Sequence, residues 1–125
     1  MASLPYLRTF TAERFAYRNL VNGMPVETAA EYRNPCREWI GALIRADGYG
    51  YVSPGAPETA ARLAYRDAVL SHRKNGIYGA MFVAAMIAAG FIVHDVHELI
   101  RLGLRKIPQR SRLASAVRAT LHAAR

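Results

Sequence analysis

The longest apolar stretch of the chain runs from Gly76 to Val93 and contains eighteen residues without a charged side chain. Alanine recurs along it at every fourth position, at Ala80, Ala84 and Ala88. Residues four apart lie on one face of a helix, and small side chains on that face let a second helix approach closely. A helix with no polar face is covered by other helices or by lipid. The pattern therefore predicts either a buried central helix or a membrane span.

Length and composition favour the buried helix. Eighteen residues are at the short end of what crosses a bilayer, and eight of them are glycine or alanine, which contribute little transfer free energy. The remaining chain supplies amphipathic helices whose apolar faces need a partner. We therefore expect this segment to be the central helix of an all-helical core, and we expect no membrane association.

Helical periodicity predicts two helices in the first part of the chain. One has Thr11 as its N-cap and ends at about Val21, before a glycine and a proline. The other covers residues 36–46, and four apolar residues form its expected buried side: Trp39, Ile40, Leu43 and Ile44. The following segment, 47–57, holds three glycines and two prolines, so it is predicted to be a loop.

A third helix is predicted from Pro57, a residue that suits the first turn of a helix. Its expected buried face carries two polar side chains, Asp67 and Ser71, which lie four residues apart. Buried aspartate is rare without a partner. The two side chains are therefore either a hydrogen-bonded structural pair or the lining of a polar pocket.

Two more helices are predicted after the central one. Asp95 and Glu98 have the spacing of a capping box, Pro108 ends that helix, and Ser111 can cap the last one. No alternating strand pattern of useful length is present. The predicted class is all-α, with five or six helices in one domain of residues 1–125.

The net charge of +8 is concentrated near the C-terminal end. Residues 99–125 contain no acidic side chain and seven basic ones: Arg101, Arg105, Lys106, Arg110, Arg112, Arg118 and Arg125. Such a stretch can bind nucleic acid or another anionic surface. No aromatic residue interleaves it, as a base-stacking surface would need, so we interpret it as a solvated helix face and expect no nucleic-acid partner. The single Cys36 and the absence of a signal peptide in MASLPYLRTF predict a cytoplasmic protein.

Few motifs of known chemistry occur in the chain. His94 and His97, together with Asp95 and Glu98, are weak evidence for a metal site, because no third ligand is placed and capping explains both acids. The segment SHRKNGIYG offers a second possibility at the start of the central helix. His72, Asn75 and the backbone N–H groups of residues 76–79 could bind a phosphate group, because helix N-termini attract anions.

The segment WIGALIRADGYGYVSPGAPETAARLAYRDAVLSHRKNGIYGAMFVAAMIAAGF resembles the middle of the ADP-ribosylglycohydrolase family, the all-helical enzymes similar to dinitrogenase reductase-activating glycohydrolase. LPYLRTFTAERFAYRNLVNG and GLRKIPQRSRLASAV look like its flanks in a bacterial subgroup, so the similarity extends from about Leu4 to Val117. The resemblance implies hydrolysis of the bond between ADP-ribose and an acceptor, assisted by two Mg or Mn ions. It implies ADP-ribose or an ADP-ribosylated substrate as the ligand.

In this family the metal ligands come from a Thr-Asp-Asp motif and an Asp-x-Asp-Thr/Ser motif. The chain contains neither Asp-Asp nor Asp-x-Asp, so both motifs would lie outside it, and we expect no metal ligand and no turnover by this chain alone. The alternative is a non-catalytic helical module for binding or for forming a homo-oligomer.

The resemblance also implies which residues contact the substrate. Residues 41–45, with Gly41 and Arg45, resemble the segment that cradles the diphosphate, and Asp47 follows it. The other substrate-binding positions implied are Ser71, His72, Asn75 and Tyr78. Ala80 departs from the acidic residue expected in this subgroup.

Overall fold

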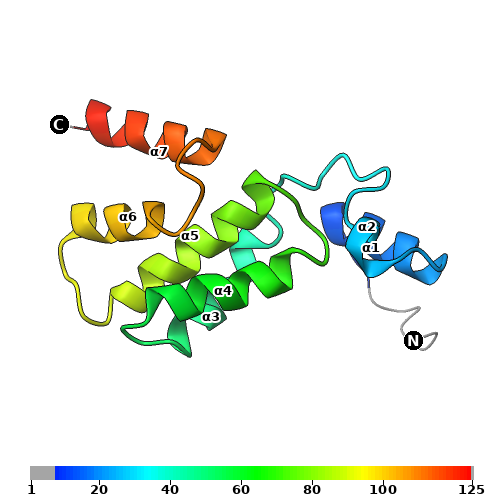
Figure 1. The fold of residues 1–125 in the computed structure, drawn as a ribbon, viewed down its shortest axis with the longest axis horizontal. Coiled ribbons are helices and arrows are strands. Elements are labelled where there is room, and N and C mark those ends of the chain that lie inside the picture. The colour runs from blue at the N-terminus through cyan, green and yellow to red at the C-terminus, as the bar shows by residue number, and fades with distance from the viewer. Residues whose placement is uncertain (1–7, 125) are drawn as a thin grey trace.

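The computed structural model describes residues 8–124, and every regular element in that part of the chain is helical (Figure 1). Its seven α-helices and one 3-10 helix are, in order, α1 (Thr11–Val21), α2 (Val26–Ala29), η1 (Leu43–Arg45), α3 (Asp47–Tyr51), α4 (Pro57–Ala68), α5 (Asn75–Ala89), α6 (Val96–Leu104) and α7 (Arg112–Ala123). The all-α class is confirmed. The described part of the chain has more helices than the five or six expected.

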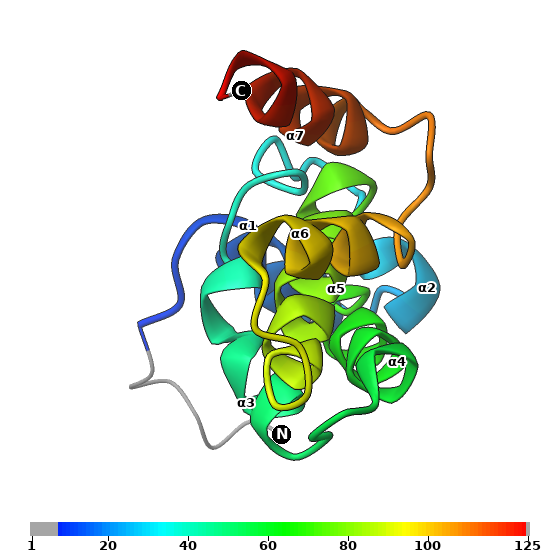
Figure 2. The ribbon, with the colours of Figure 1, turned by 90° about the vertical axis from the view of Figure 1, so that its left-hand side faces the viewer.

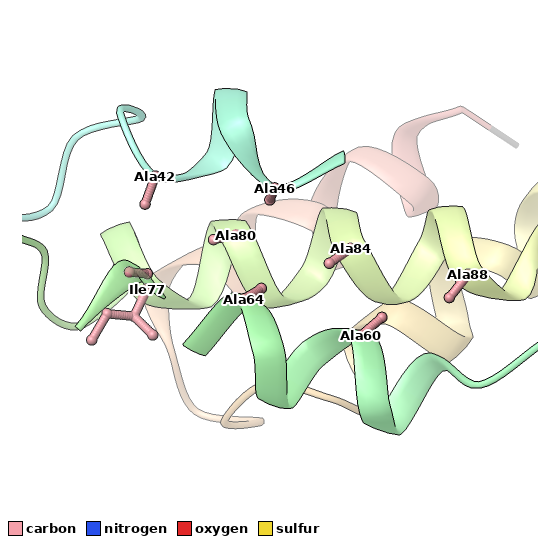
Figure 3. Close-up of a cluster of buried hydrophobic side chains, with 9 residues drawn as sticks. Ala42, Ala46, Ala60, Ala64, Ile77, Ala80, Ala84 and Ala88 are labelled. Atoms are coloured by element: carbon pink, nitrogen blue, oxygen red, sulfur yellow. The ribbon is translucent and has the colours of Figure 1, made fainter. Parts of the chain in front are cut away.

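Helix α5 is central, and α3, α4 and α6 all contact it (Figures 1 and 2). The expected row of Ala80, Ala84 and Ala88 is buried, and it faces buried alanines of α4 such as Ala60 and Ala64 (Figure 3). Methyl groups on both helices keep the side-chain layer between them thin, which is what the alanine spacing predicted. The central-helix prediction is therefore confirmed. No helix in the described residues is both long enough and apolar enough to cross a membrane.

Helices α6 and α7 cover the opposite side of α5 through a second apolar cluster. Leu104, Ile107 and Ala114 are its buried members, and partly buried side chains of α5 such as Phe82 pack against them. Both helix starts have the predicted caps. The Asp95 carboxylate accepts a hydrogen bond from the backbone N–H of residue 98 at 2.7 Å, and the Ser111 hydroxyl accepts one from that of Ala114 at 3.1 Å.

The helix predicted over residues 36–46 is wrong. This segment forms a series of turns and ends in the short helix η1. Three residues of its expected buried side are exposed instead, namely Trp39, Ile40 and Ile44. The backbone is held by polar contacts that do not belong to a helix, because Asn34 Oδ1 accepts from the N–H of Cys36 and the Arg37 carbonyl accepts from the N–H of Arg73.

The predicted loop over residues 47–57 is only partly correct, because it begins with helix α3. The glycines that disfavour a helix locally allow close packing here. A Cβ at Gly50 would lie 2.5 Å from Ile87 Cγ2 and 3.0 Å from the Ala84 carbonyl oxygen. Contact with α5 therefore outweighs the low helix propensity of glycine.

The first helix has the predicted bounds but not the predicted cap. Phe10 is the N-cap residue of α1 and makes no side-chain capping bond. The Thr11 hydroxyl instead donates to the Glu13 carboxylate at 3.3 Å. Residues 1–7, which include Leu4 and most of the segment MASLPYLRTF, lie outside the described residues. Arg125 lies outside them as well.

Candidate functional site

The guanidinium group of Arg45 joins three parts of the chain. Its Nε donates to the Asp67 carboxylate on α4 at 2.7 Å, and its Nη1 donates to the Glu13 carboxylate on α1. Its Nη2 donates to the Ser71 hydroxyl at 3.2 Å, and Nη1 also reaches the Gly41 carbonyl at 3.3 Å. The Arg45 side chain is 34% exposed. The Arg45 cluster, meaning these five residues together with His72, thus has an outer edge that a ligand could contact.

His72 lies at the inner end of this cluster. Its side chain is fully buried, and its Nδ1 is 2.8 Å from the Ser71 hydroxyl oxygen. The other ring nitrogen, Nε2, is buried and has no hydrogen-bond partner among residues 8–124. A Cβ at Gly76 would lie 3.0 Å from His72 Cδ2 and 2.5 Å from the Arg37 carbonyl oxygen. A glycine at the start of α5 is therefore what lets the helix approach the imidazole and the turn segment.

The charges of the cluster act in opposite directions on its two basic groups. Burial lowers the pKa of Arg45, but the hydrogen bonds and charges of Asp67 and Glu13 outweigh burial and leave that pKa above its ordinary value. Burial also lowers the pKa of His72, and in that case the nearby acids do not compensate. Arg45 is thus a fixed cation, and His72 is neutral near pH 7.

Asn34 holds the backbone that surrounds the cluster. Its buried side-chain amide donates to the carbonyls of Ala12, Ala30 and Ser71 at 3.2, 2.9 and 3.1 Å, and its Oδ1 accepts from the Cys36 N–H at 3.1 Å. Sequence reasoning missed both Asn34 and Glu13. Asn34 precedes a proline, and asparagine at such a position often binds neighbouring backbone groups, which is the signal that could have found it.

Of the seven substrate-binding positions implied by the resemblance, the structure brings four together. Gly41, Arg45, Ser71 and His72 belong to the Arg45 cluster. Asp47 does not, because its exposed side chain accepts a local bond from the Gly48 N–H.

The remaining two positions contact other parts of the molecule. The Asn75 side chain donates to the Glu38 carboxylate at 2.8 Å and accepts from the backbone N–H of Leu113 at 3.1 Å, so it ties the first turn of α7 to α5. Tyr78 is partly buried and packs against both apolar clusters, and Ala80 is part of the α4–α5 interface. Asp67 and Ser71 are not a directly bonded pair, because Arg45 bridges them.

At the start of α5, most of the backbone donors expected to bind a phosphate group are already engaged. The N–H groups of Gly76, Ile77 and Tyr78 already donate to the carbonyls of Arg73 and Lys74 at 3.0 Å. Arg73 is also engaged, because its guanidinium binds the Glu31 carboxylate at 3.1 Å and backbone carbonyls of residues 27, 69 and 72. A phosphate group would therefore find few open donors there.

A divalent metal does not fit the described donor set. Within residues 8–124, no group of three or more histidine, cysteine, aspartate or glutamate side chains is placed to hold one. The two acids that do approach each other, Glu13 and Asp67, bind a single guanidinium that occupies the space between them. The cation that these two carboxylates bind is the Arg45 guanidinium.

The fold is thus an all-α domain built around a helix of small residues. Its candidate site is a buried Ser-His pair in contact with an arginine that binds two carboxylates. The chain matches the family model for ADP-ribosylglycohydrolase over residues 5–125, so it belongs to the ADP-ribosylglycohydrolase family. Searches of curated proteins and of solved structures gave no significant match.

Proposed function

We propose that the chain binds the ADP-ribosyl group of a substrate at the Arg45 cluster and does not by itself hydrolyse the glycosidic bond. The family reaction is removal of ADP-ribose from an acceptor, and the proposed compartment is the cytoplasm. The observation that carries the proposal is the contact of Arg45, about one-third exposed, with the buried Ser71–His72 pair. Family membership supplies the ligand class.

The hydrogen-bonding capacity of Arg45 supports this assignment. A guanidinium carries five N–H donors. Four are used in the described structure, by Asp67, Glu13, Gly41 and Ser71, which leaves one on Nη2. That N–H can donate to an oxygen of the diphosphate, while the partly exposed carboxylates can accept hydrogen bonds from ribose hydroxyls. A binding site for a nucleotide sugar needs both a cationic donor for the diphosphate and acceptors for the ribose hydroxyls.

Titration of the purified chain with ADP-ribose, followed by calorimetry, tests the binding proposal. We expect saturable binding that falls at least tenfold in Arg45→Met, because the variant loses every guanidinium donor. Arg66→Met is the matched control, since Arg66 is an exposed arginine of α4 outside the cluster. Circular dichroism shows whether each variant is folded. Equal binding by folded Arg45→Met and by the wild type would contradict the site.

Release of ADP-ribose from an ADP-ribosylated protein, with Mg or Mn present, tests the second half of the proposal. We expect no release by the purified chain, because no described set of side chains can hold two metal ions. A metal-dependent release activity that co-elutes with the protein in chromatography would show that the chain is a hydrolase in its own right.

A second candidate function is assembly into a homo-oligomer. The observation that favours it is the exposure of Trp39, Ile40 and Ile44, three large apolar residues within one short segment. Light scattering after size exclusion separates the candidates. A dimer that dissociates in Ile40→Asp supports assembly through this segment, and a monomer at all concentrations excludes it.

A further inference from the structure

The hydroxyl group of Ser71 has two hydrogen-bond partners in the described structure, and their identities fix the direction of its proton. Arg45 Nη2 can only donate, so it occupies one lone pair of the Ser71 oxygen. The other partner is His72 Nδ1, at 2.8 Å. His72 Nδ1 is therefore the acceptor available to the Ser71 hydroxyl proton. If Nδ1 carried a hydrogen, the oxygen would accept twice and its own buried hydrogen would point at no acceptor.

With the hydrogen on Nδ1, two buried polar atoms of the described residues would lack a partner, the Ser71 hydroxyl hydrogen and Nε2. With Ser71 donating to Nδ1 only Nε2 lacks one, so this arrangement is favoured. The ring is neutral because burial disfavours the imidazolium. A neutral imidazole that accepts at Nδ1 carries its hydrogen on Nε2. Nε2 is also the ring atom that lacks a partner in the described part of the chain. The unsatisfied atom in the cluster is thus an N–H donor.

We infer that Arg45 is a positioning residue which acts through Ser71 to hold His72 as an Nε2–H donor toward an oxygen atom that completes the buried site. The oxygen belongs to a bound ADP-ribosyl group or to an internal water molecule. Assigning it to the nucleotide rests on the proposed function, whereas the state of the imidazole does not. Glu13 and Asp67 act indirectly, because they fix the guanidinium that faces Ser71.

Long-range nitrogen–proton correlation spectra of the imidazole test the first part of the inference, because the protonated and unprotonated ring nitrogens resonate far apart. His94, His97 and His122 are exposed, so a variant with glutamine at these three positions retains His72 alone. We expect one tautomer, with Nδ1 unprotonated and the hydrogen on Nε2. An Nδ1–H tautomer or an imidazolium near pH 7 would overturn the inference.

Substitutions within this variant test the role of Arg45. Ser71→Ala removes the relay, so we expect the single tautomer to be replaced by a mixture, while Ser71→Thr keeps the hydroxyl and should restore it. Arg45→Lys keeps the charge but cannot reach both carboxylates and Ser71, so it should also produce a mixture. A pure Nε2–H tautomer in folded Arg45→Lys and folded Ser71→Ala would show that neither residue sets it. Circular dichroism confirms folding in each case.

Addition of ADP-ribose distinguishes the two sources of the oxygen. A shift of the His72 Nε2 and Nε2–H resonances together with the Arg45 Nε–H resonance assigns the oxygen to the nucleotide. A shift of Arg45 alone overturns that assignment and leaves an internal water as the acceptor. No shift of either residue contradicts the proposed function, and the tautomer result stands independently of it.

Discussion

The two halves of this fold are held together by different kinds of contact. Helices α4 and α5 meet through alanine methyl groups, and the buried members of that interface are apolar, among them Ala64 and Ala84. The segment from α1 to η1 contributes Ala42 to the same apolar cluster, but it also joins the rest of the chain through buried hydrogen bonds and ion pairs. Asn34 binds the Ser71 carbonyl, and Arg45 binds Asp67. Figure 1 shows this segment beside the α4–α5 pair, near the loop that connects the two helices.

The difference indicates where each half tolerates change. An alanine interface has no polar group to lose, but it has no room for a larger side chain. A hydrogen-bonded junction can accept small shifts in volume, but every lost partner leaves a buried polar group unsatisfied. The candidate site lies at the hydrogen-bonded junction, where orientation of side chains is specified by geometry and not by packing alone.

Removal of the Asn34 side chain should have the largest effect on the polar half. Asn34→Ala removes a buried amide that binds three carbonyls and one N–H, and each group left unsatisfied costs roughly 1–3 kcal/mol, partly recovered by relaxation. We expect a loss of about 3–5 kcal/mol in the free energy of unfolding, measured with urea. Asn22→Ala, at an exposed asparagine, is the control and should change it by less than about 0.5 kcal/mol.

Overpacking of the alanine interface should have the next largest effect. Ala84 is fully buried, and Ala84→Leu inserts three heavy atoms where α4 and α3 approach α5. We expect the free energy of unfolding to fall by about 3 kcal/mol, with the melting temperature as the second measurement. Ala119→Leu places the same side chain on the exposed face of α7 and should be nearly neutral. Equal losses at both positions would show that close packing is not the cause.

These two halves also differ in how far the sequence could predict them. The four-residue spacing of Ala80, Ala84 and Ala88 directly predicts the buried central helix, because periodicity reports which face is covered. The caps at Asp95 and Ser111 are equally local signals, and both are present.

The polar junction depends on partners far apart in the chain. Asn34 and Ser71 are separated by 37 positions, and Arg45 and Glu13 by 32. No local pattern specifies such pairs, so Glu13 and Asn34 were missed. The apolar residues at 39, 40 and 44 fit a helix by period, but the turn contacts of Cys36 and Arg37 determine the backbone there. Within the site, Gly41 and Arg45 came from the family resemblance, whereas the residue pattern alone also made Ser71 and His72 candidates.

The link between α5 and α7 is polar but only partly buried, so it should matter less. Asn75→Ala removes the bond to Glu38 and the acceptor for the Leu113 N–H. We expect a loss of about 1–2 kcal/mol, because a neutral bond contributes roughly 1 kcal/mol, the bond to the carboxylate somewhat more, and water can replace part of both. Hydrogen exchange should accelerate in the first turn of α7 and remain unchanged at the start of α1. Uniform acceleration would contradict this local role.

The polar half should also respond to pH in a range where the alanine interface does not. Burial lowers the pKa of His72 in the folded protein, and the nearby Arg45 charge lowers it further, whereas Glu13 and Asp67 oppose the shift. The unfolded chain, with an ordinary histidine pKa of about 6.5, therefore binds its proton at a higher pH than the folded chain does. Stability is greatest above that pH and declines as the pH falls through it toward the folded pKa.

We expect the free energy of unfolding of the wild type to decrease between about pH 7.5 and about pH 5.5, and the decrease to be smaller in His72→Gln, which cannot take up the proton. His97→Gln replaces an exposed histidine and should keep the slope of the wild type. The comparison uses the change with pH and not the stability itself, because His72→Gln alters buried packing at every pH. Hydrogen exchange identifies the part of the fold that loses stability at the lower pH. Faster exchange in α1 and the 71–75 turn at the lower pH, with α5 protected, would tie it to the polar junction, and equal slopes in all three proteins would remove His72 as its cause.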